Sequence, residues 1–179
     1  CQSSSSGSGD ARQAPDFALK TLEGGTFELA EHRGDVVVVN FWATWCAPCV
    51  QEIPVFIEMQ RKFGDDGLQF VGVSLDKQGF EVVRPFAEKM QINYPLVVDD
   101  GSLAKEFGGL QGVPTTYVVD TEGQIQHRIE GITTEQHLRS LVDGMLTLTE
   151  SEGSGETVSD DEDSGADPAP QPSPSSTSS

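Results

Sequence analysis

The sequence predicts an α/β domain in which a central mixed β-sheet is flanked by helices on both faces. Three features predict this class. The run at 35–42 is β-branched and lacks polar alternation, which is typical of a strand buried on both faces. Apolar residues recur at helical spacing at 46–63, at 80–91 and after residue 133. Short apolar segments that favour strands alternate with these helices, and a hairpin signal precedes the last one.

Two short extended pieces, at 17–20 and 26–29, open the domain. Gly24 and Gly25 lie between them and favour a turn, because glycine adopts the backbone angles that tight turns require. The sequence therefore predicts an N-terminal β-hairpin ahead of the buried strand at 35–42.

A helix is expected from Cys46 to about Phe63, with its apolar residues on one broad arc. Pro54 lies inside this segment and is expected to kink it, since proline lacks the N–H that a helix interior uses. Gly64 and Gly67 are expected to end it. The arc consists of Val50, Ile53, Phe56, Ile57 and Phe63.

The middle of the domain continues the alternation of strands and helices. Strands are expected at 68–75 and 94–98, and an amphipathic helix is expected between them at 80–91, interrupted by Pro85. A short helix at 102–107 follows the second of these strands.

A hairpin and a helix complete the domain. Strands at 115–119 and 124–130 are joined by Asp-Thr-Glu-Gly, a hairpin signal. The last helix is expected to start at Thr133, with Gln136 three residues on in a capping-box pattern. Its predicted apolar face consists of Leu138, Leu141, Val142 and Met145.

The two ends of the chain differ from the domain in composition. Residues 1–13 are rich in Ser and Gly, and residues 149–179 hold eight acidic residues, no Lys or Arg, and a Pro/Ser-rich end. Neither segment has the apolar residues that would offset the entropy of ordering it. We therefore expect a flexible tether at 1–13, a folded domain at 14–148 and a disordered acidic tail at 149–179.

The charge of the chain excludes one class of partner. The 179 residues include 29 acidic and 11 basic residues, which gives a net charge of −18. Nucleic-acid binding through clustered Lys and Arg is therefore excluded, and docking of a basic face on anionic lipid is disfavoured. No apolar run approaches the ~20 residues that a membrane-spanning helix needs.

Cys1 stands ahead of the Ser/Gly tether, as in a mature bacterial lipoprotein, where the signal peptide is cut just before a lipid-bearing cysteine. On this interpretation lipid at Cys1 anchors the chain to a membrane. The domain then works outside the cytoplasm, in the periplasm or at the outer face of the cytoplasmic membrane. A dithiol there meets oxidising conditions and needs a source of electrons. The alternative is that Cys1 marks an arbitrary fragment boundary.

Cys46 and Cys49 form a C-x-x-C motif where the buried strand is expected to lead into a helix. The N–H groups and dipole at a helix N-terminus favour a thiolate, so we expect Cys46 to be the attacking, more exposed sulfur. Cys49 lies one turn later on the same side, and is expected to be the shielded sulfur that resolves a mixed disulfide. Pro48 fits the first turn, where its missing N–H is not needed. The predicted chemistry is thiol–disulfide exchange without a cofactor.

Three other interpretations of the C-x-x-C motif are less consistent with the sequence. A zinc half-site needs a second pair of ligands, but no other Cys pair exists. His32, His127 and His137 lack ligand spacing, so no metal site is expected. A purely structural disulfide would close a loop too small to stabilise the fold much. A peroxide-reducing site normally has Thr or Ser three residues before its cysteine, where this chain has Ala43.

The chain resembles the thioredoxin superfamily, in particular its membrane-anchored, extracytoplasmic branch of TlpA-, ResA- and DsbE-like thiol–disulfide oxidoreductases, which are related to the AhpC-TSA (redoxin) proteins. The resemblance covers about 14–147, nearly all of the expected domain. It rests on APDFAL at 14–19, VVVVNFWATWCAPC at 36–49, Glu-Ile-Pro at 52–54 and GVPTTYVVD at 112–120.

The resemblance implies a thioredoxin fold with a TlpA-like central insertion at about 76–100. It also implies that Pro114 is the cis-proline that faces the active disulfide. The backbone of Val113 would then pair with substrate near Cys46. Trp45 matches the aromatic residue before the first cysteine, and is expected to flank the disulfide as a contact surface for substrate.

Glu52 matches the acid in the Cys-x-x-Glu pattern of this branch. It follows Cys49 by three residues on the same side of the predicted helix, where burial would let it tune the thiol pKa values or relay a proton. A solvated helix acid is the alternative. The chain departs from ordinary thioredoxins at Asn40, where they place a buried Asp. Asn cannot exchange a proton, which shifts that task to Glu52 or to water. Trp42 is expected in the core.

The resemblance implies reduction of disulfides in exported proteins, as in cytochrome c maturation, where apocytochrome c is the client. Electrons would come from a membrane thiol donor of the DsbD or CcdA type. The same residues would serve an oxidant that introduces disulfides, because direction depends on the relative stability of dithiol and disulfide. A third interpretation is a copper-binding or copper-delivery module on the same fold, since soft thiolates suit Cu(I). The additional Cys or His typical of such modules is not evident here.

Overall fold

The computed structural model describes residues 12–146 of the chain. These residues form eight strands, four α-helices and two 3₁₀ turns, and none of the helices is long and apolar enough to cross a membrane. The strands are β1 (Arg12–Gln13), β2 (Ala18–Lys20), β3 (Thr26–Glu28), β4 (Val36–Trp42), β5 (Leu68–Ser74), β6 (Leu96–Val98), β7 (Thr115–Val119) and β8 (Gln124–Glu130). The α-helices are α1 (Ala47–Phe63), α2 (Phe80–Met90), α3 (Ser102–Glu106) and α4 (Glu135–Leu146).

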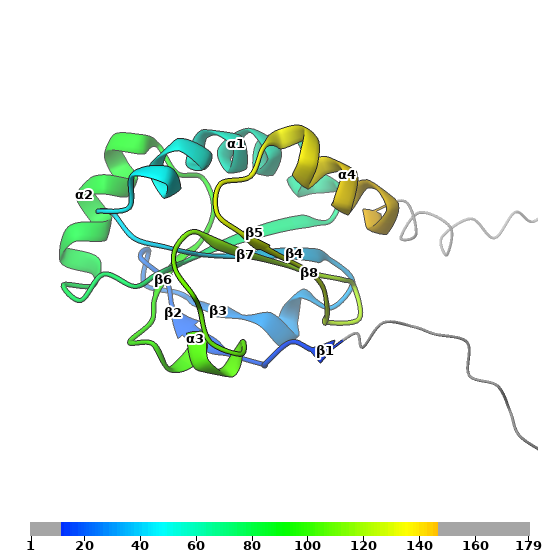
Figure 1. Cartoon of the computed structure of the whole chain (residues 1–179), viewed down its shortest axis with the longest axis horizontal. Coiled ribbons are helices and arrows are strands. Elements are labelled where there is room, and N and C mark those ends of the chain that lie inside the picture. The colour runs from blue at the N-terminus through cyan, green and yellow to red at the C-terminus, as the bar shows by residue number, and fades with distance from the viewer. Residues whose placement is uncertain (1–11, 147–179) are drawn as a thin grey trace, which may run out of the picture.

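A six-stranded mixed sheet runs through the centre of the domain in the order β1-β8-β7-β4-β5-β6. Strands β4, β5 and β6 are parallel, whereas β7 and β8 run antiparallel to their neighbours. Helices α1, α2 and α4 cover one face, and α3 lies on the other face with the β2–β3 hairpin (Figure 1). The expected mixed sheet, the helices on both faces and the N-terminal hairpin are therefore confirmed.

Strand β4 lies between β5 and β7, and all seven of its residues are buried. Successive side chains of a strand point to opposite faces. Val36 and Val38 therefore pack on the α1 side of the sheet, and Val37 and Val39 on the α3 side. Two apolar faces explain why this segment shows no alternation. Asn40 is the exception, because its position places a polar side chain on the α1 side.

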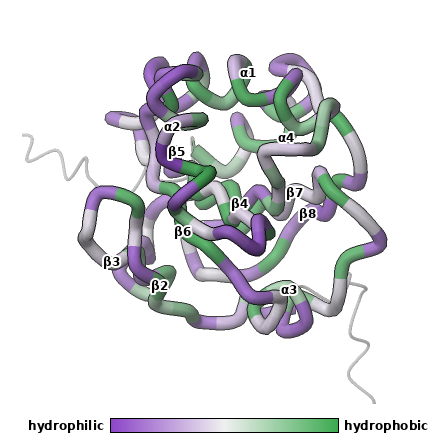
Figure 2. Tube along the Cα trace, turned by 90° about the vertical axis from the view of Figure 1, so that its left-hand side faces the viewer, coloured by the Kyte–Doolittle hydropathy of each residue, from purple (hydrophilic) through white to green (hydrophobic). Residues whose placement is uncertain are grey.

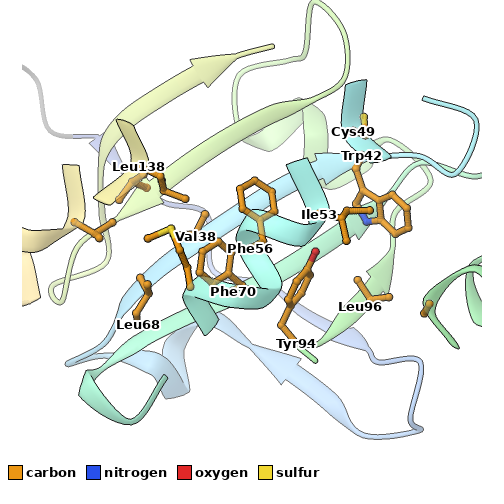
Figure 3. Close-up of a cluster of buried hydrophobic side chains, with 14 of the residues drawn as sticks. Val38, Trp42, Cys49, Ile53, Phe56, Leu68, Phe70, Tyr94, Leu96 and Leu138 are labelled. Atoms are coloured by element: carbon orange, nitrogen blue, oxygen red, sulfur yellow. The ribbon is translucent and has the colours of Figure 1, made fainter. Parts of the chain in front are cut away.

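Hydrophobic residues gather in two clusters, one on each face of the sheet. On the α1 side, Phe56 of α1 and Phe70 of β5 have ring centroids 5.1 Å apart, and Tyr94 packs against Phe70 (Figure 3). In Figure 2 hydrophobic residues are frequent along the central strands, and hydrophilic residues are frequent in the peripheral turns. Cys46 and Cys49 belong to the α1-side cluster, so the redox motif is continuous with the core.

Helix α1 continues without a break through Pro54, but its buried side differs from the predicted arc. Val50, Ile57 and Phe63 are only partly buried. The buried residues are Cys49, Glu52, Ile53, Phe56 and Met59. Residues three and four apart form this line, as expected for one side of a helix. It includes Glu52, which a hydropathy pattern does not select.

Strand β1 lies at the end of the expected N-terminal tether, where Arg12 and Gln13 pair antiparallel with the edge of β8. Both residues are exposed, and the pairing uses main-chain groups, so no apolar pattern accompanies it. Residues 1–11, which hold Cys1 and the rest of the predicted tether, lie outside the described residues, as does 147–179 with the predicted tail.

Helix α4 is capped one residue later than the sequence predicted. The expected cap was Thr133, with Gln136 three residues on. Instead, Thr134 Oγ1 accepts a hydrogen bond from the His137 N–H at 3.2 Å. Thr133 is instead buried, and its N–H donates to Glu52. Of the predicted apolar face, Leu138 and Val142 are buried together with Leu146, whereas Leu141 and Met145 are partly buried.

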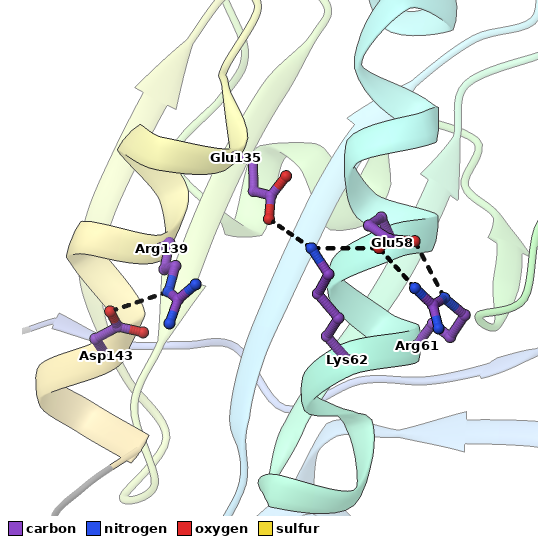
Figure 4. Close-up of polar contacts among 6 residues, drawn as sticks. All are labelled: Glu58, Arg61, Lys62, Glu135, Arg139 and Asp143. Carbon is purple, nitrogen blue, oxygen red and sulfur yellow. Dashed lines mark hydrogen bonds and ion pairs between the residues drawn. The ribbon is translucent and has the colours of Figure 1, made fainter.

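Charged side chains connect the outer surfaces of α1 and α4 (Figure 4). The Lys62 Nζ of α1 lies 3.0 Å from Glu135 Oε1 of α4 and 3.2 Å from Glu58 Oε1. These groups are partly exposed to solvent, so each pair contributes little to stability. The helices are held on the sheet mainly by the apolar cluster beneath them.

Candidate active site

A disulfide joins Cys46 and Cys49 where β4 leads into α1, and the two Cα atoms are 5.3 Å apart. Cys46 is the N-cap of the helix, and its Sγ accepts a hydrogen bond from the Cys49 N–H at 3.3 Å. Pro48 lies in the first turn, as predicted. Cys46 is 5% exposed and Cys49 is 0% exposed. Cys46 is thus the more exposed of the two sulfurs, and its role as the attacking sulfur stays a prediction.

The loop before β7 faces this disulfide. The Val113–Pro114 peptide bond is cis, as the resemblance implied. Cys46 Sγ lies 3.5 Å from the Val113 carbonyl oxygen, a contact in which the disulfide sulfur has no proton to donate. On the other side, the Pro114 carbonyl accepts a hydrogen bond from the Gly131 N–H at 2.9 Å. The cis-proline loop is thus held between the disulfide and the segment that leads from β8 to α4.

Glu52 is completely buried behind the disulfide, on the same side of α1 as Cys49. Its Oε1 accepts a hydrogen bond from Asn40 Nδ2 at 2.9 Å, and its Oε2 accepts one from the Thr133 N–H at 3.2 Å. Burial raises the pKa of Glu52 to about 7, and the two hydrogen bonds oppose this rise. The solvated alternative is therefore wrong, and the acid can gain or lose a proton near neutral pH.

Asn40 connects this acid to the next strand of the sheet, since its Nδ2 also lies 3.0 Å from Thr116 Oγ1 on β7. The sequence identified Asn40 only as a departure from the thioredoxin pattern. It missed Thr116 and Thr133, whose partners are 76 and 81 residues away along the chain. The position of Asn40 in β4 offers a signal for Thr116, because alternate residues of a strand share a face and Asn40 lies on that of Val36 and Val38. A polar residue on its α1 side requires polar partners there.

Exposed apolar side chains border the disulfide. Trp45 is 71% exposed, whereas Trp42 is 1% exposed and packs against Phe86 with ring centroids 5.3 Å apart. The two tryptophans thus divide as predicted, one on the surface and one in the core. Ile132 is 51% exposed, and the sequence did not select it. It follows Gly131, which is bonded to Pro114, and so lies beside the cis-proline loop.

His32 makes its contacts with residues outside the disulfide site. His32 stacks on Phe27 with ring centroids 4.6 Å apart, and its Nδ1 lies 3.1 Å from Asp35 Oδ2. Across residues 12–146, His, Cys, Asp and Glu form no group of three or more that could hold a metal ion.

A disulfide at the start of a helix, a cis-proline facing it and a sheet of this topology define the class of thioredoxin-fold thiol–disulfide oxidoreductases. The chain belongs to the AhpC/TSA family, whose family model matches residues 11–128. Within that family it groups with the ResA- and DsbE-like oxidoreductases, as the sequence predicted.

Two curated relatives and one solved structure illustrate the similarity. Thioredoxin-like protein YneN of Bacillus subtilis is 35% identical over 136 residues, which cover 75% of this chain and 79% of the relative. Thiol-disulfide oxidoreductase ResA of Geobacillus thermodenitrificans is 34% identical over 132 residues, which cover 72% of this chain and 75% of the relative. A thiol:disulfide interchange protein of the thioredoxin family from Chlorobium tepidum superposes with a TM-score of 0.72 at 30% identity. That match covers 78% of this chain and 99% of the other.

Proposed function

We propose that this oxidoreductase works as a reductant, and that the dithiol of Cys46 and Cys49 reduces disulfides of exported proteins. The observation that carries the proposal is the completely buried acid Glu52, with a pKa of about 7, on the Cys49 side of the motif. A strong oxidant of this kind needs its reduced form stabilised. A carboxylate in the core disfavours a thiolate at Cys49, and so opposes the stabilisation of the reduced form. The disulfide is then the favoured product.

The reaction proceeds in two exchanges. The Cys46 thiolate attacks one sulfur of a client disulfide. A mixed disulfide forms, the client S–S bond breaks, and the second client sulfur leaves as a thiolate that takes a proton. The Cys49 thiolate then attacks Cys46 Sγ, which restores the Cys46–Cys49 disulfide and releases the first client sulfur as a thiol. Two electrons pass to the client, and a thiol donor must return them to the chain.

Glu52 serves the second exchange. Cys49 is completely buried, so its thiol cannot pass its proton directly to solvent. A carboxylate with a pKa of about 7 is suited to accept that proton at neutral pH, because a general base works best when its pKa lies near the working pH. Asn40 and the Thr133 N–H orient its two oxygens.

The client is held by the surface around the disulfide. Trp45 supplies a large exposed aromatic face beside Cys46. Val113 and Pro114 form the facing wall, and the backbone of Val113 lies at contact distance from Cys46 Sγ. A client segment that pairs with this backbone brings its own disulfide against Cys46.

The reduction potential of the Cys46–Cys49 pair tests this proposal. The measurement uses the full chain with Cys1→Ser, so that two thiols remain, equilibrated in a glutathione or dithiothreitol redox buffer. A value near or below the roughly −270 mV of thioredoxin supports a reductant. A value near the roughly −120 mV of DsbA overturns the proposal and assigns the introduction of disulfides instead.

We further propose that the domain acts outside the cytoplasm, anchored by lipid at Cys1, with apocytochrome c as client and a membrane thiol donor of the DsbD or CcdA type. The support is the resemblance and the position of Cys1 before a Ser/Gly tether. Expression of the precursor in a bacterial host, followed by membrane fractionation, tests the anchor. Cys1→Ser should release the domain from the membrane fraction. An oxidised peptide with a haem-attachment Cys-x-x-Cys-His tests the client, and should be reduced faster than a scrambled peptide of the same composition.

A further inference from the structure

A second buried carboxylate, Asp76, contacts the turn that leads into the active-site disulfide. Asp76 follows β5 and is 3% exposed. Its Oδ1 accepts a hydrogen bond from the Thr44 hydroxyl at 2.7 Å, and its Oδ2 accepts one from the Thr44 N–H at 2.9 Å. The Ser74 hydroxyl also donates to Oδ2, at 2.8 Å. The carboxylate therefore holds Thr44 at two points, one on the side chain and one on the main chain.

Thr44 belongs to the turn that carries the reacting sulfur. This active-site turn, residues 43–46, joins β4 to α1 and contains the exposed Trp45. The Cys46 N–H donates to the Ala43 carbonyl at 3.1 Å, which closes the turn. The position of Thr44 thus determines where the next two residues point.

We propose that Asp76 is a positioning residue for disulfide exchange. By holding Thr44 it fixes the active-site turn, so that Trp45 and Cys46 Sγ are presented together beside the Val113 carbonyl. A carboxylate is costly to bury unless it is hydrogen-bonded, and its bonds are stronger than those of a neutral acceptor. Asp76 therefore makes the turn rigid, and a rigid turn keeps the sulfur in line with an approaching client disulfide. The inference rests on the proposed role of Cys46 as the attacking sulfur.

Asp99 provides a matched control on the same edge of the sheet. It is 5% exposed, and like Asp76 it lines the groove at the carboxyl ends of β5 and β6. It also accepts three hydrogen bonds, from the N–H groups of Leu103 and Ala104 and from the Ser102 hydroxyl. These donors belong to α3, so Asp99 stabilises the start of α3 and not the active-site turn.

The first test compares Asp76→Asn with Asp99→Asn in the full chain carrying Cys1→Ser. Asparagine has one acceptor oxygen, so Asp76→Asn cannot satisfy all three donors. We expect kcat/KM for reduction of insulin disulfides to fall about tenfold, which is the effect of losing about one hydrogen bond in the reacting complex. Asp99→Asn should lose comparable stability in urea and keep its exchange rate. Equal losses of activity in the two variants would overturn the proposal.

The second test uses Thr44 and avoids any change in charge. Thr44→Val removes the hydroxyl donor, whereas Thr44→Ser keeps it, so exchange should slow in the first and remain near the unchanged rate in the second. The rate with a small disulfide should change less than the rate with insulin in Thr44→Val, because a small reagent needs no presented Trp45. Equal rates for the two Thr44 variants would also contradict the proposal.

We measure both the reduction of disulfides and the oxidation of dithiols. The two rates distinguish a failure of this inference from a failure of the proposed function. If the chain oxidises dithiols faster than it reduces disulfides, the reductant proposal fails, and the Asp76→Asn effect on both rates still decides the role of Asp76. If Cys46→Ser retains exchange, the proposed function and the inference fail together.

Discussion

The side-chain amide of Asn40 donates a hydrogen bond of 2.9 Å to Glu52 Oε1, and so joins the central strand to the buried acid of α1. The bond favours the ionised form of Glu52 and lowers its pKa, in opposition to burial. Asn40 has no proton to exchange at neutral pH, so it can orient the acid without competing for its proton.

Asn40→Asp should place a second carboxyl group beside that of Glu52, so that the two titrate as a coupled pair. Two carboxyl groups at hydrogen-bonding distance cannot both ionise easily, so the pair should titrate in two steps, the upper one above the value of about 7 for Glu52. Side-chain carboxyl chemical shifts, followed by NMR against pH, measure this. Asn40→Leu is the control, because it removes the amide donor without adding an acid. If Asn40→Asp shows a single titration step at the unchanged pKa of Glu52, the contact between residues 40 and 52 is contradicted.

Glu52 should make the folded state less stable as pH rises. Its pKa is raised from 4.5 to about 7 on folding, so the folded state binds more protons than the unfolded state between these values. Its stabilising protonation is complete below about pH 4.5 and is lost as pH rises through about 7. The free energy of unfolding should fall by about 3 kcal/mol over this range.

Glu52→Gln is the comparison that isolates this effect. Glutamine offers one oxygen to the two donors at the site, which adds a cost that does not vary with pH. The difference between the two unfolding free energies should therefore change by about 3 kcal/mol between pH 4.5 and 7.5. Urea unfolding of the oxidised proteins at both pH values provides the measurement. Parallel pH profiles would show that Glu52 does not hold the proton.

Replacement of Cys49 should trap a mixed disulfide with the client, whereas replacement of Cys46 should not. Cys49→Ser leaves Cys46 free to attack and removes the sulfur that resolves the product, so a mixed disulfide with the client should accumulate. Cys46→Ser leaves a sulfur that is 0% exposed, so no adduct should form and turnover should stop. Non-reducing electrophoresis after acid quenching distinguishes the two. Accumulation in Cys46→Ser would reverse the roles.

Trp45→Ala should weaken the capture of protein clients. A large exposed aromatic residue at a contact surface commonly contributes enough for roughly a tenfold change in affinity. We expect KM for insulin to rise by about this factor while the rate with a small disulfide stays unchanged. Trp45→Phe should restore much of the loss. An unchanged KM in Trp45→Ala would place the client surface elsewhere.

Much of the fold was predictable because two patterns are strong in this chain. The β-branched run of β4 required cover on both faces, and the spacing of apolar residues in α1 required a sheet beneath it. The redox motif and the cis-proline followed from specific residues and their resemblance. These patterns depend on side-chain type, which the sequence displays directly.

The remaining features depend on main-chain donors and distant pairings. The Thr133 N–H that donates to Glu52 has no signature in residue type, and the cap of α4 lies one residue later than predicted, at Thr134. The hydrogen bonds from Thr44 to Asp76 join residues that are 32 positions apart along the chain. The parallel pairing of β4 with β5 brings these two residues together. Strand β1 pairs through exposed residues that no hydropathy pattern selects.

The strand register also places the active-site disulfide and the start of the described domain at opposite ends of β8. The chain enters the described domain at β1, which pairs with the start of β8, whereas the end of β8 lies beside Thr115 and the cis-proline loop. At about 3.3 Å per residue, the length of β8 separates these points by about 20 Å. Helix α4 likewise starts beside the Glu52 site, and Figure 1 shows it running away from that site. At about 1.5 Å per residue, its two ends are about 17 Å apart. Arg12 and Leu146, the two ends of the described domain, therefore lie on the side away from the active-site disulfide.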